Sequence, residues 1–130
     1  MVCVLGCRLR VEVEITSTGE WLWAEYDHVT VESETDNYTL HVAEYHGNAG
    51  DAFNYEYPDF QSNGMPFSTP DRDNDQWAAG SCAGSRGSGW WFRHCSISML
   101  NGMVERYWHV TTSMQWRQVS ANRMMLQCAP

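Results

Sequence analysis

The sequence contains no lysine: its eight basic residues are all arginines, and sixteen acidic residues bring the net charge to −8. Such a chain has no basic field to gather phosphates, so the composition disfavours nucleic acid as a partner. No apolar run approaches the roughly 18 residues of a membrane-spanning helix, and the opening MVCVLGC is too short for the apolar core of a secretory signal. As written, the chain is expected to be soluble, with no insertion into a membrane.

Motifs of catalysis are also missing. The sequence has no nucleophile elbow, phosphate-binding loop or HExxH motif, and it has no CxxC pair for a structural zinc site. Ser96 and His94 lie close together in the sequence, but nothing supplies the orienting group or the oxyanion hole that an acyl-transfer pair needs. We therefore predict that the chain is not an enzyme.

The sequence is rich in aromatic residues and cysteine. Seven Trp, six Tyr and four Phe within 130 residues can fill a real core, which favours one domain. Five cysteines fit an oxidising compartment, and the loop-like surroundings of Cys82 and Cys95 favour disulfide bonding over zinc. For Cys3, Cys7 and Cys128 three alternatives stay open: pairing among themselves, pairing with another chain, or free thiols.

Alternating apolar and polar residues predict several strands. Residues 9–15 alternate cleanly, and turn residues at 17–19 connect them to a second expected strand at 22–31, which suggests a hairpin. The same period continues through residues 38–42, and residues 122–127 are expected to form a closing strand. The sheet is therefore expected to be antiparallel at least in its first part.

Asn37 begins the sequon Asn-Tyr-Thr, which is a glycosylation site only in a secreted protein and is otherwise unused. Beyond it, the periodicity disappears over residues 46–89, where Gly, Asn, Asp, Ser and Pro dominate. Loops of that length are usually functional or held by another element. The candidate clamps are a metal ion and a disulfide.

Three carboxylates alternate at Asp71, Asp73 and Asp75, a pattern that suits a hard cation such as calcium. The stretch is not an EF-hand, because Gln76 stands where that loop requires glycine and Cys82 stands where it requires glutamate. The alternative is a solvated acidic turn whose side chains cap backbone amides.

The order and spacing of several motifs resemble the fibrinogen C-terminal domain, the module of fibrinogens, ficolins, tachylectins and angiopoietins. The motifs are NGM at 63–65, FST at 67–69, DRDND at 71–75, CAGSRGSGWW at 82–91 and LNG at 100–102. Upstream, LRVEVEI at 9–15, AEY at 24–26 and YHGNAGD at 45–51 are also similar to family motifs.

The resemblance implies an α+β fold with a twisted, mainly antiparallel sheet, few short helices and a loop-rich calcium-binding subdomain. Residues 1–130 are expected to form a single partial domain, in which the family's amino-terminal subdomain is missing. We expect residues 8–55 to supply central strands and residues 56–130 to form the loop-rich subdomain that binds calcium and ligand.

The resemblance also places a calcium site in the acidic loop. Asp71 would support the site from outside, and one extra residue before Cys82 leaves Gly80 as an alternative carbonyl donor. The implied ligands are the carboxylates of Asp73 and Asp75 and the backbone carbonyls of Trp77 and Ala79.

The implied ligand site lies beside a Cys82–Cys95 disulfide and a cis peptide at His94–Cys95, whose amide faces the ligand in the family. This chain departs from lectin-like members, because Ser96 replaces a histidine and Ser85 and Arg86 replace an aromatic residue. The loop between LNG and the next tryptophan is also shortened to residues 103–107. The candidate ligand-binding residues are Ser85, Arg86, His94, Cys95 and Ser96.

Arg86 can pair with a carboxylate through two parallel hydrogen bonds, which makes an acidic sugar or peptide end as suitable as an acetyl group. The alternative is a solvated surface arginine. Trp90 and Trp91 are interpreted as core anchors rather than a sugar platform, because adjacent side chains of that size seldom both face water.

These features lead us to expect a secreted, calcium-stabilised recognition domain of lectin type, which binds glycans or acetylated or acidic groups in innate immunity. The alternative is an extracellular signalling or matrix ligand that binds a receptor protein through the same surface. We also expect self-association, with residues 9–15 as an exposed sheet strand and Cys128 as a covalent link between chains.

Overall fold

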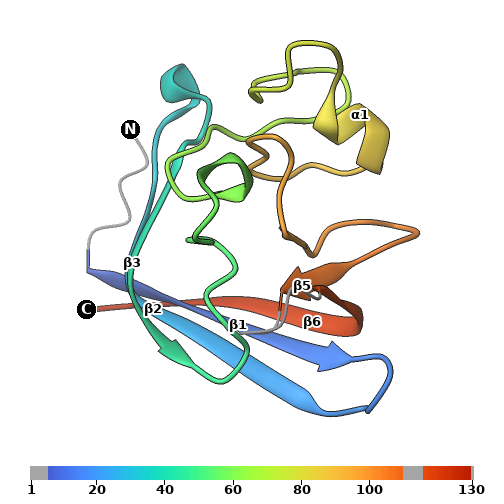
Figure 1. Ribbon diagram of the computed structural model, residues 1–130. Helices are drawn as coiled ribbons and strands as arrows, with labels where there is room; N and C mark the ends of the chain where they lie inside the picture. The colour runs from blue at the N-terminus through green and yellow to red at the C-terminus, as the bar shows by residue number, and fades with distance from the viewer. Residues whose placement is uncertain (1–5, 110–115, 130) are drawn as a thin grey trace.

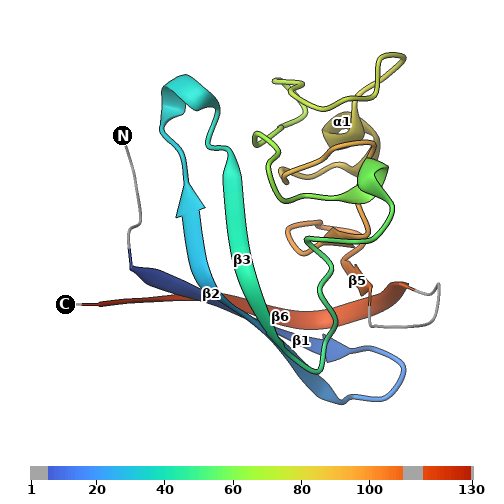
Figure 2. The same ribbon diagram turned by 60° about the vertical axis from the view of Figure 1, so that its left-hand side comes forward.

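The computed structural model describes residues 6–109 and 116–129, and its main feature is one curled antiparallel sheet (Figures 1 and 2). The strand order is β3-β2-β1-β6-β5-β4. Within the described residues, helical structure is limited to α1 (Cys82–Arg86) and two 3-10 turns, Glu34–Asp36 and Pro58–Phe60. This architecture confirms the expected fold class. The strands are β1 (Cys7–Ile15), β2 (Trp21–Val31), β3 (Leu40–Gly47), β4 (Ser98–Met99), β5 (Tyr107–His109) and β6 (Trp116–Cys128).

The first two strands form the expected hairpin. Every second side chain of β1 from Leu9 to Ile15 is buried, and the N–H of Ile15 donates to the carbonyl of Glu20 across the turn. The third strand begins at Leu40 rather than Tyr38, because Asn37, which ends the preceding 3-10 turn, and Tyr38 both have a left-handed backbone (φ 52° and 57°). The alternation therefore predicted β1 and β2 closely. It did not predict β4 or β5, and β6 extends beyond the expected residues 122–127.

β1 lies in the interior of the sheet, between β2 and β6. The expectation that residues 9–15 form an exposed strand is therefore wrong: β6 returns antiparallel along β1 and places Leu126 opposite Leu9. The register also brings Cys128 to Cys7, and the two form a disulfide. Cys128 is thus not available as the expected link between chains, and Cys3 lies outside the described residues.

Loop segments between β3 and β5 pack against one face of the sheet (Figures 1 and 2). The core joins buried residues of the strands, such as Val11 and Tyr26, to buried aromatics of the loops, among them Phe53, Trp90 and Trp108. Each of these aromatic side chains is fully buried. Burial of apolar area therefore holds the loop-rich layer in place, despite its small content of regular structure.

The segment after β3 is fastened to β2 at Trp23. Gly47 has a φ of 140°, and a Cβ at this position would overlap the carbonyl of Trp23, so only glycine fits. The next residue, Asn48, accepts a hydrogen bond from the N–H of Trp23 (2.9 Å), and the N–H groups of Asn48 and Ala49 donate to the Trp23 carbonyl (3.0 and 2.9 Å). This turn directs the chain from the sheet edge into the loop-rich layer.

A buried phenol provides a second attachment. The hydroxyl of Tyr26 donates to Asp51 (2.7 Å), and burial, followed by the nearby Asp51 charge, raises the pKa of Tyr26. The hydroxyl of an unfolded tyrosine ionises at about pH 10. Above that pH the unfolded state therefore releases a proton that the folded state keeps. The free energy of unfolding is therefore expected to fall above about pH 10, by up to about 1.4 kcal/mol per pH unit for this residue.

Urea unfolding between pH 8 and pH 11 measures this slope. The variant Tyr26→Phe lacks the ionising group, so its stability is expected to fall less steeply with pH. Equal slopes for the two proteins would show that ionisation of Tyr26 does not cause the loss of stability at alkaline pH.

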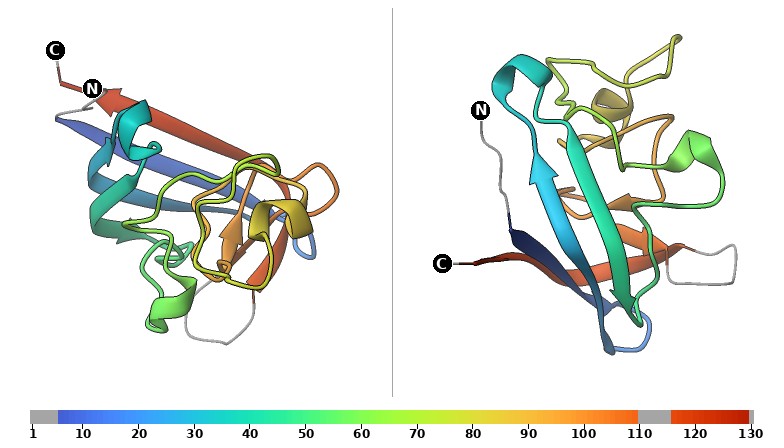
Figure 3. Two further views of the ribbon diagram at one scale, coloured as in Figure 1. Left: turned by 90° about the horizontal axis from the view of Figure 1, so that it is seen from above. Right: turned by 90° about the vertical axis from the view of Figure 1, so that its left-hand side faces the viewer.

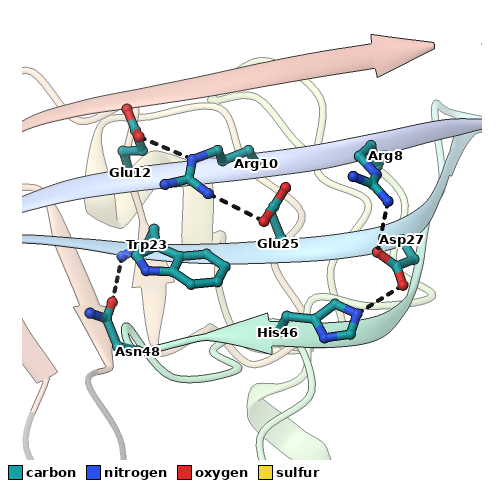
Figure 4. Close-up of polar contacts among 8 residues, drawn as sticks. All are labelled: Arg8, Arg10, Glu12, Trp23, Glu25, Asp27, His46 and Asn48. Carbon is teal, nitrogen blue, oxygen red and sulfur yellow. Dashed lines mark hydrogen bonds and ion pairs between the residues drawn. The ribbon is translucent and has the colours of Figure 1, made fainter.

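The opposite face of the sheet carries charged side chains in a lateral network (Figure 4). Arg10 donates to Glu12 (3.0 Å) and Glu25 (3.2 Å), and its guanidinium lies 4.7 Å from the centre of the Trp23 ring. A second chain of contacts joins Arg8 to Asp27 (3.6 Å) and Asp27 to His46 (2.8 Å). Because these groups are partly or largely solvated, each pair contributes little to stability. The sheet thus has one solvated face and one face for the core.

Candidate functional site

The acidic loop, residues 71–80, is organised by its own carboxylates. Asp75 accepts hydrogen bonds from the N–H groups of Trp77 and Cys82 (2.8 Å each), and Asp73 accepts one from the N–H of Asp75 (3.2 Å). Asp71 accepts from the hydroxyl of Thr69 (2.6 Å), which holds the pKa of this carboxyl below its usual range. Asp71 is thus engaged outside the expected ligand set.

Among residues 6–109 and 116–129, no three His, Cys, Asp or Glu side chains come together as a metal site. The set expected from the sequence has only Asp73 and Asp75 as side-chain ligands, with the carbonyls of Trp77 and Ala79 completing it. Oxygen ligands of this mixed kind suit calcium. The carboxylate oxygens that accept N–H groups keep further lone pairs for a metal ion, so this set of oxygen ligands fits calcium. Calcium binding stays a prediction.

An aromatic stack joins the acidic loop to the predicted ligand site. The ring of Trp77 stacks on that of His94, with centroids 6.0 Å apart and planes inclined by 25°. A Cβ at Gly80 would approach ring atoms of Trp77 to 2.8 Å, so Gly80 leaves space for this ring. The N–H of Gln76 also donates to the carbonyl of Arg93 (2.7 Å). The two parts of the site are therefore in direct contact.

The structure contains the disulfide Cys82–Cys95 and the cis peptide His94–Cys95, as the sequence led us to expect. Neighbouring loops hold this turn: the N–H of His94 donates to the carbonyl of Asp59 (2.9 Å). Arg93 donates from its side chain to the carbonyls of Gln61 (2.9 Å) and Asn63 (3.0 Å). Residues 59–63, the helix α1 and residues 93–95 thus meet at this turn.

A pocket of about 380 Å³ opens beside this turn. It includes Arg86, Cys95 and Ser96 from the expected ligand-binding set; Ser85 and His94 are not among its lining residues. Aromatic residues of the aperiodic loop and His109 were not expected in the site, since neither periodicity nor a motif marks them. The lining residues are Tyr55, Tyr57, Phe60, Arg86, Cys95, Ser96, Ile97 and His109.

The pocket is mainly apolar, with a cation at one wall. The guanidinium of Arg86 lies 5.7 Å from the centre of the ring of Tyr107, a buried residue whose pKa is raised by that burial. The backbone N–H of Cys95 has no acceptor in the described parts of the chain, whereas the buried hydroxyl of Ser96 donates to the carbonyl of Ser98. Arg86 and the Cys95 amide are therefore candidate polar contacts for a ligand.

Both adjacent tryptophans contact the core, but only Trp90 is fully buried. Trp90 is fully buried and stacks on Phe53 (centroids 5.9 Å apart), which confirms its interpretation as a core anchor. Trp91 is half-buried, and its ring nitrogen donates to the carbonyl of Tyr38 (3.0 Å). Asn37 is also half-buried, in the turn that ends there; its glycosylation stays a prediction.

A family model described as the C-terminal globular domain of fibrinogen beta and gamma chains matches residues 5–129. The chain belongs to the fibrinogen C-terminal domain family. Its relatives include protein scabrous of Drosophila melanogaster, with 38% identity over 128 residues, covering 95% of this chain and 15% of that protein. Human angiopoietin-related protein 6 is 42% identical over 86 residues, covering 66% of this chain and 16% of that protein.

Solved fibrinogen C-terminal domains have the same fold. The fibrinogen-like globe domain of human ANGPTL6 matches with a TM-score of 0.75 and 29% identity, over 96% of this chain and 58% of that one. Lamprey fibrin D-dimer, complexed with the peptide Gly-His-Arg-Pro-amide, matches with a TM-score of 0.76 and 29% identity, over 92% of this chain and 44% of that one. The chain thus spans about half of these solved chains and less than a quarter of the curated relatives named above.

In the described parts of this fibrinogen C-terminal domain, no helix has the length and apolar character needed to cross a membrane. The matches are to fibrinogen-like binding domains, and the absence of enzymatic activity stays a prediction.

Proposed function

We propose that this fibrinogen C-terminal domain is an extracellular recognition module that binds a carboxylate or acetyl group of a glycan or peptide in the pocket beside Arg86. The observation that carries the proposal is the combination of aromatic walls with one guanidinium and the amide of Cys95. Apolar walls with a few convergent polar groups are typical of ligand sites.

The position of Arg86 supports a specific role. It is the last residue of α1, whose first residue, Cys82, is bonded to Cys95. Ser81 caps the same helix by accepting a hydrogen bond from the N–H of Gly84 (3.0 Å). The cap and the disulfide restrain the backbone of Arg86, and the Tyr107 ring lies beside its guanidinium, so the group needs less ordering to bind a carboxylate.

Replacing Arg86 by Gln is expected to weaken binding of an acidic ligand at least tenfold, because a hydrogen bond to a charged group contributes about 1.5–3 kcal/mol. A glycan array with sialylated, acetylated and neutral members identifies the ligand, and calorimetry then gives the two affinities. The matched control is Arg117→Gln, which removes the same charge from an exposed position on β6. Equal affinities for all three proteins would refute the role of Arg86.

We further propose that calcium stabilises the acidic loop through Asp73, Asp75 and the carbonyls of Trp77 and Ala79. When bound, the ion neutralises the two carboxylates and fixes the loop. The Trp77–His94 stack supports an effect of this loop on the pocket, since it connects the loop to the residue before Cys95.

Calcium at about 100 times its dissociation constant is expected to raise the free energy of unfolding by about 2.7 kcal/mol. Thermal unfolding with calcium and with a chelator measures this shift. The double variant Asp73→Asn, Asp75→Asn is expected to lose it, whereas Asp71→Asn, changed in the same loop, is expected to keep it. A melting temperature indifferent to calcium in the unmodified protein would contradict the proposal.

A receptor protein is the second candidate ligand, and the rim of the pocket favours it. Tyr57 and Phe60 are 47% and 37% exposed there, and exposed aromatic residues are enriched in protein interfaces. The peptide bound in the lamprey fibrin D-dimer supports the same class of ligand. Binding to a receptor protein, together with no binding to any glycan on the array, would favour this candidate over a lectin function.

A further inference from the structure

The carboxyl half of β6 has an open edge. β5 pairs only with residues 116–118 of this strand, and Val119 adds one hydrogen bond to the carbonyl of Arg106 (2.9 Å). β1 occupies the other side of β6 as far as Cys128. Among the described residues, no strand pairs with residues 120–128 on the side that faces away from β1. We call residues 120–128, with this open side, the β6 edge. Figure 3 (left) shows this strand at the margin of the sheet.

The β6 edge presents three consecutive apolar side chains. Met124, Met125 and Leu126 are 36%, 38% and 56% exposed. The register places Met124 and Leu126 opposite the buried Val11 and Leu9 of β1, so both lie on the core face of the sheet. The apolar face of the sheet therefore continues onto a margin where these side chains are only partly covered.

Most of the edge also lacks features that prevent pairing with another strand, since the bulge of β6 lies at its first residue, Ser120. Residues 120–128 contain no proline, lysine or acidic residue, and their single charge belongs to Arg123. That guanidinium is already engaged by Glu12 (3.1 Å) and by the ring of Trp21 (4.9 Å). Natural edge strands are usually protected by charges, proline or bulges. The chain has a net charge of −8, but this edge carries no acidic side chain, so two copies would repel each other less here than at an acidic surface.

We propose that two copies of this chain pair through the β6 edge, antiparallel, about a two-fold axis at Met125. This register places Met125 opposite itself and Met124 opposite Leu126, so that every exposed apolar side chain of the edge meets another. It also places Arg123 opposite Gln127, so no like charges are directly opposed. Registers centred on Met124 or Leu126 place apolar side chains opposite polar ones or cysteine. The β6 edge thus fits a second copy, with the core faces of both sheets on the same side.

Light scattering after size-exclusion chromatography tests the proposal. The mass is expected to rise with concentration from 14.9 kDa towards twice that value. Leu126→Lys is expected to abolish this increase in mass, because each copy would then place a lysine charge on the apolar face of the paired β6 strands. The matched control is Val104→Lys, which removes an apolar side chain that is 98% exposed elsewhere and is expected to leave the rise unchanged.

Hydrogen exchange identifies the surface directly. Amides of residues 123–127 are expected to become at least tenfold better protected as the protein is concentrated, while amides of the acidic loop keep their rates. A monomer at every concentration would overturn the proposal, and so would a dimer that persists in a folded Leu126→Lys variant. Circular dichroism of each variant establishes that it is folded.

Discussion

Replacing Cys7 and Cys128 together by serine is expected to lower the free energy of unfolding by about 5 kcal/mol, the largest effect of any substitution considered for this chain. The two cysteines are separated by 121 positions, so their disulfide closes almost the entire chain into one loop. In the chain-entropy model the stabilisation grows with the logarithm of loop length, because a longer loop removes more conformations from the unfolded state. A small domain stable by only about 5–15 kcal/mol would become marginal without this bond.

Urea unfolding followed by tryptophan fluorescence measures this loss. The comparison variant is Cys82→Ser, Cys95→Ser, whose disulfide has a separation of 13 and is expected to contribute about 3 kcal/mol. Peptide mapping without reduction gives an independent check, since it should recover Cys7 linked to Cys128. Recovery of Cys3 linked to either of them, or a smaller loss for the long loop than for the short one, would contradict the prediction.

The second large effect is expected for Trp108→Ala, at about 3–5 kcal/mol. Trp108 is fully buried, packs edge-on against Phe53 (centroids 5.2 Å apart) and donates from its ring nitrogen to the carbonyl of Gly50 (3.0 Å). Its removal leaves a cavity and a buried carbonyl without its donor at the junction of β5 and the loop-rich layer. Both consequences destabilise the folded state.

Trp21→Ala is the control, because Trp21 is 42% exposed and lies on the solvated face of the sheet. Its substitution is expected to change the free energy of unfolding by less than about 1 kcal/mol. Far-ultraviolet circular dichroism during urea unfolding measures both variants, since each loses a fluorescent ring. Equal losses for the two variants would mean that Trp108 does not join the layers as described.

Sequence reasoning was most successful where burial follows a local period. The alternation of residues 9–15 predicted β1 because neighbouring side chains of a strand point to opposite faces, one towards the core. It did not predict which strand lies beside β1, since pairing with β6 depends on residues more than a hundred positions away. The expected edge was therefore assigned to the wrong strand, and the bond between Cys7 and Cys128 stayed one alternative among several.

The pocket shows the same limit. Its position beside Cys95, with Arg86 in the wall, followed from motif resemblance. Tyr55, Tyr57 and Phe60 could not be assigned to it, because they lie in an aperiodic loop whose path is set by distant contacts such as that of Asp59 with His94. The orientation of the Ser96 hydroxyl likewise depends on the turn to Ser98 rather than on residue type.

The bond between Cys7 and Cys128 also determines how the domain responds to mechanical load. A pull applied to the chain at residues 6 and 129 passes from one cysteine directly to the other, and the N–H of Ala129 already contacts the carbonyl of Gly6 (3.2 Å) just outside the bridge. All residues between the two cysteines, including the acidic loop and the pocket, then lie off the path of the force. Tension from outside the bridge would therefore leave the ligand site undeformed while the disulfide is intact.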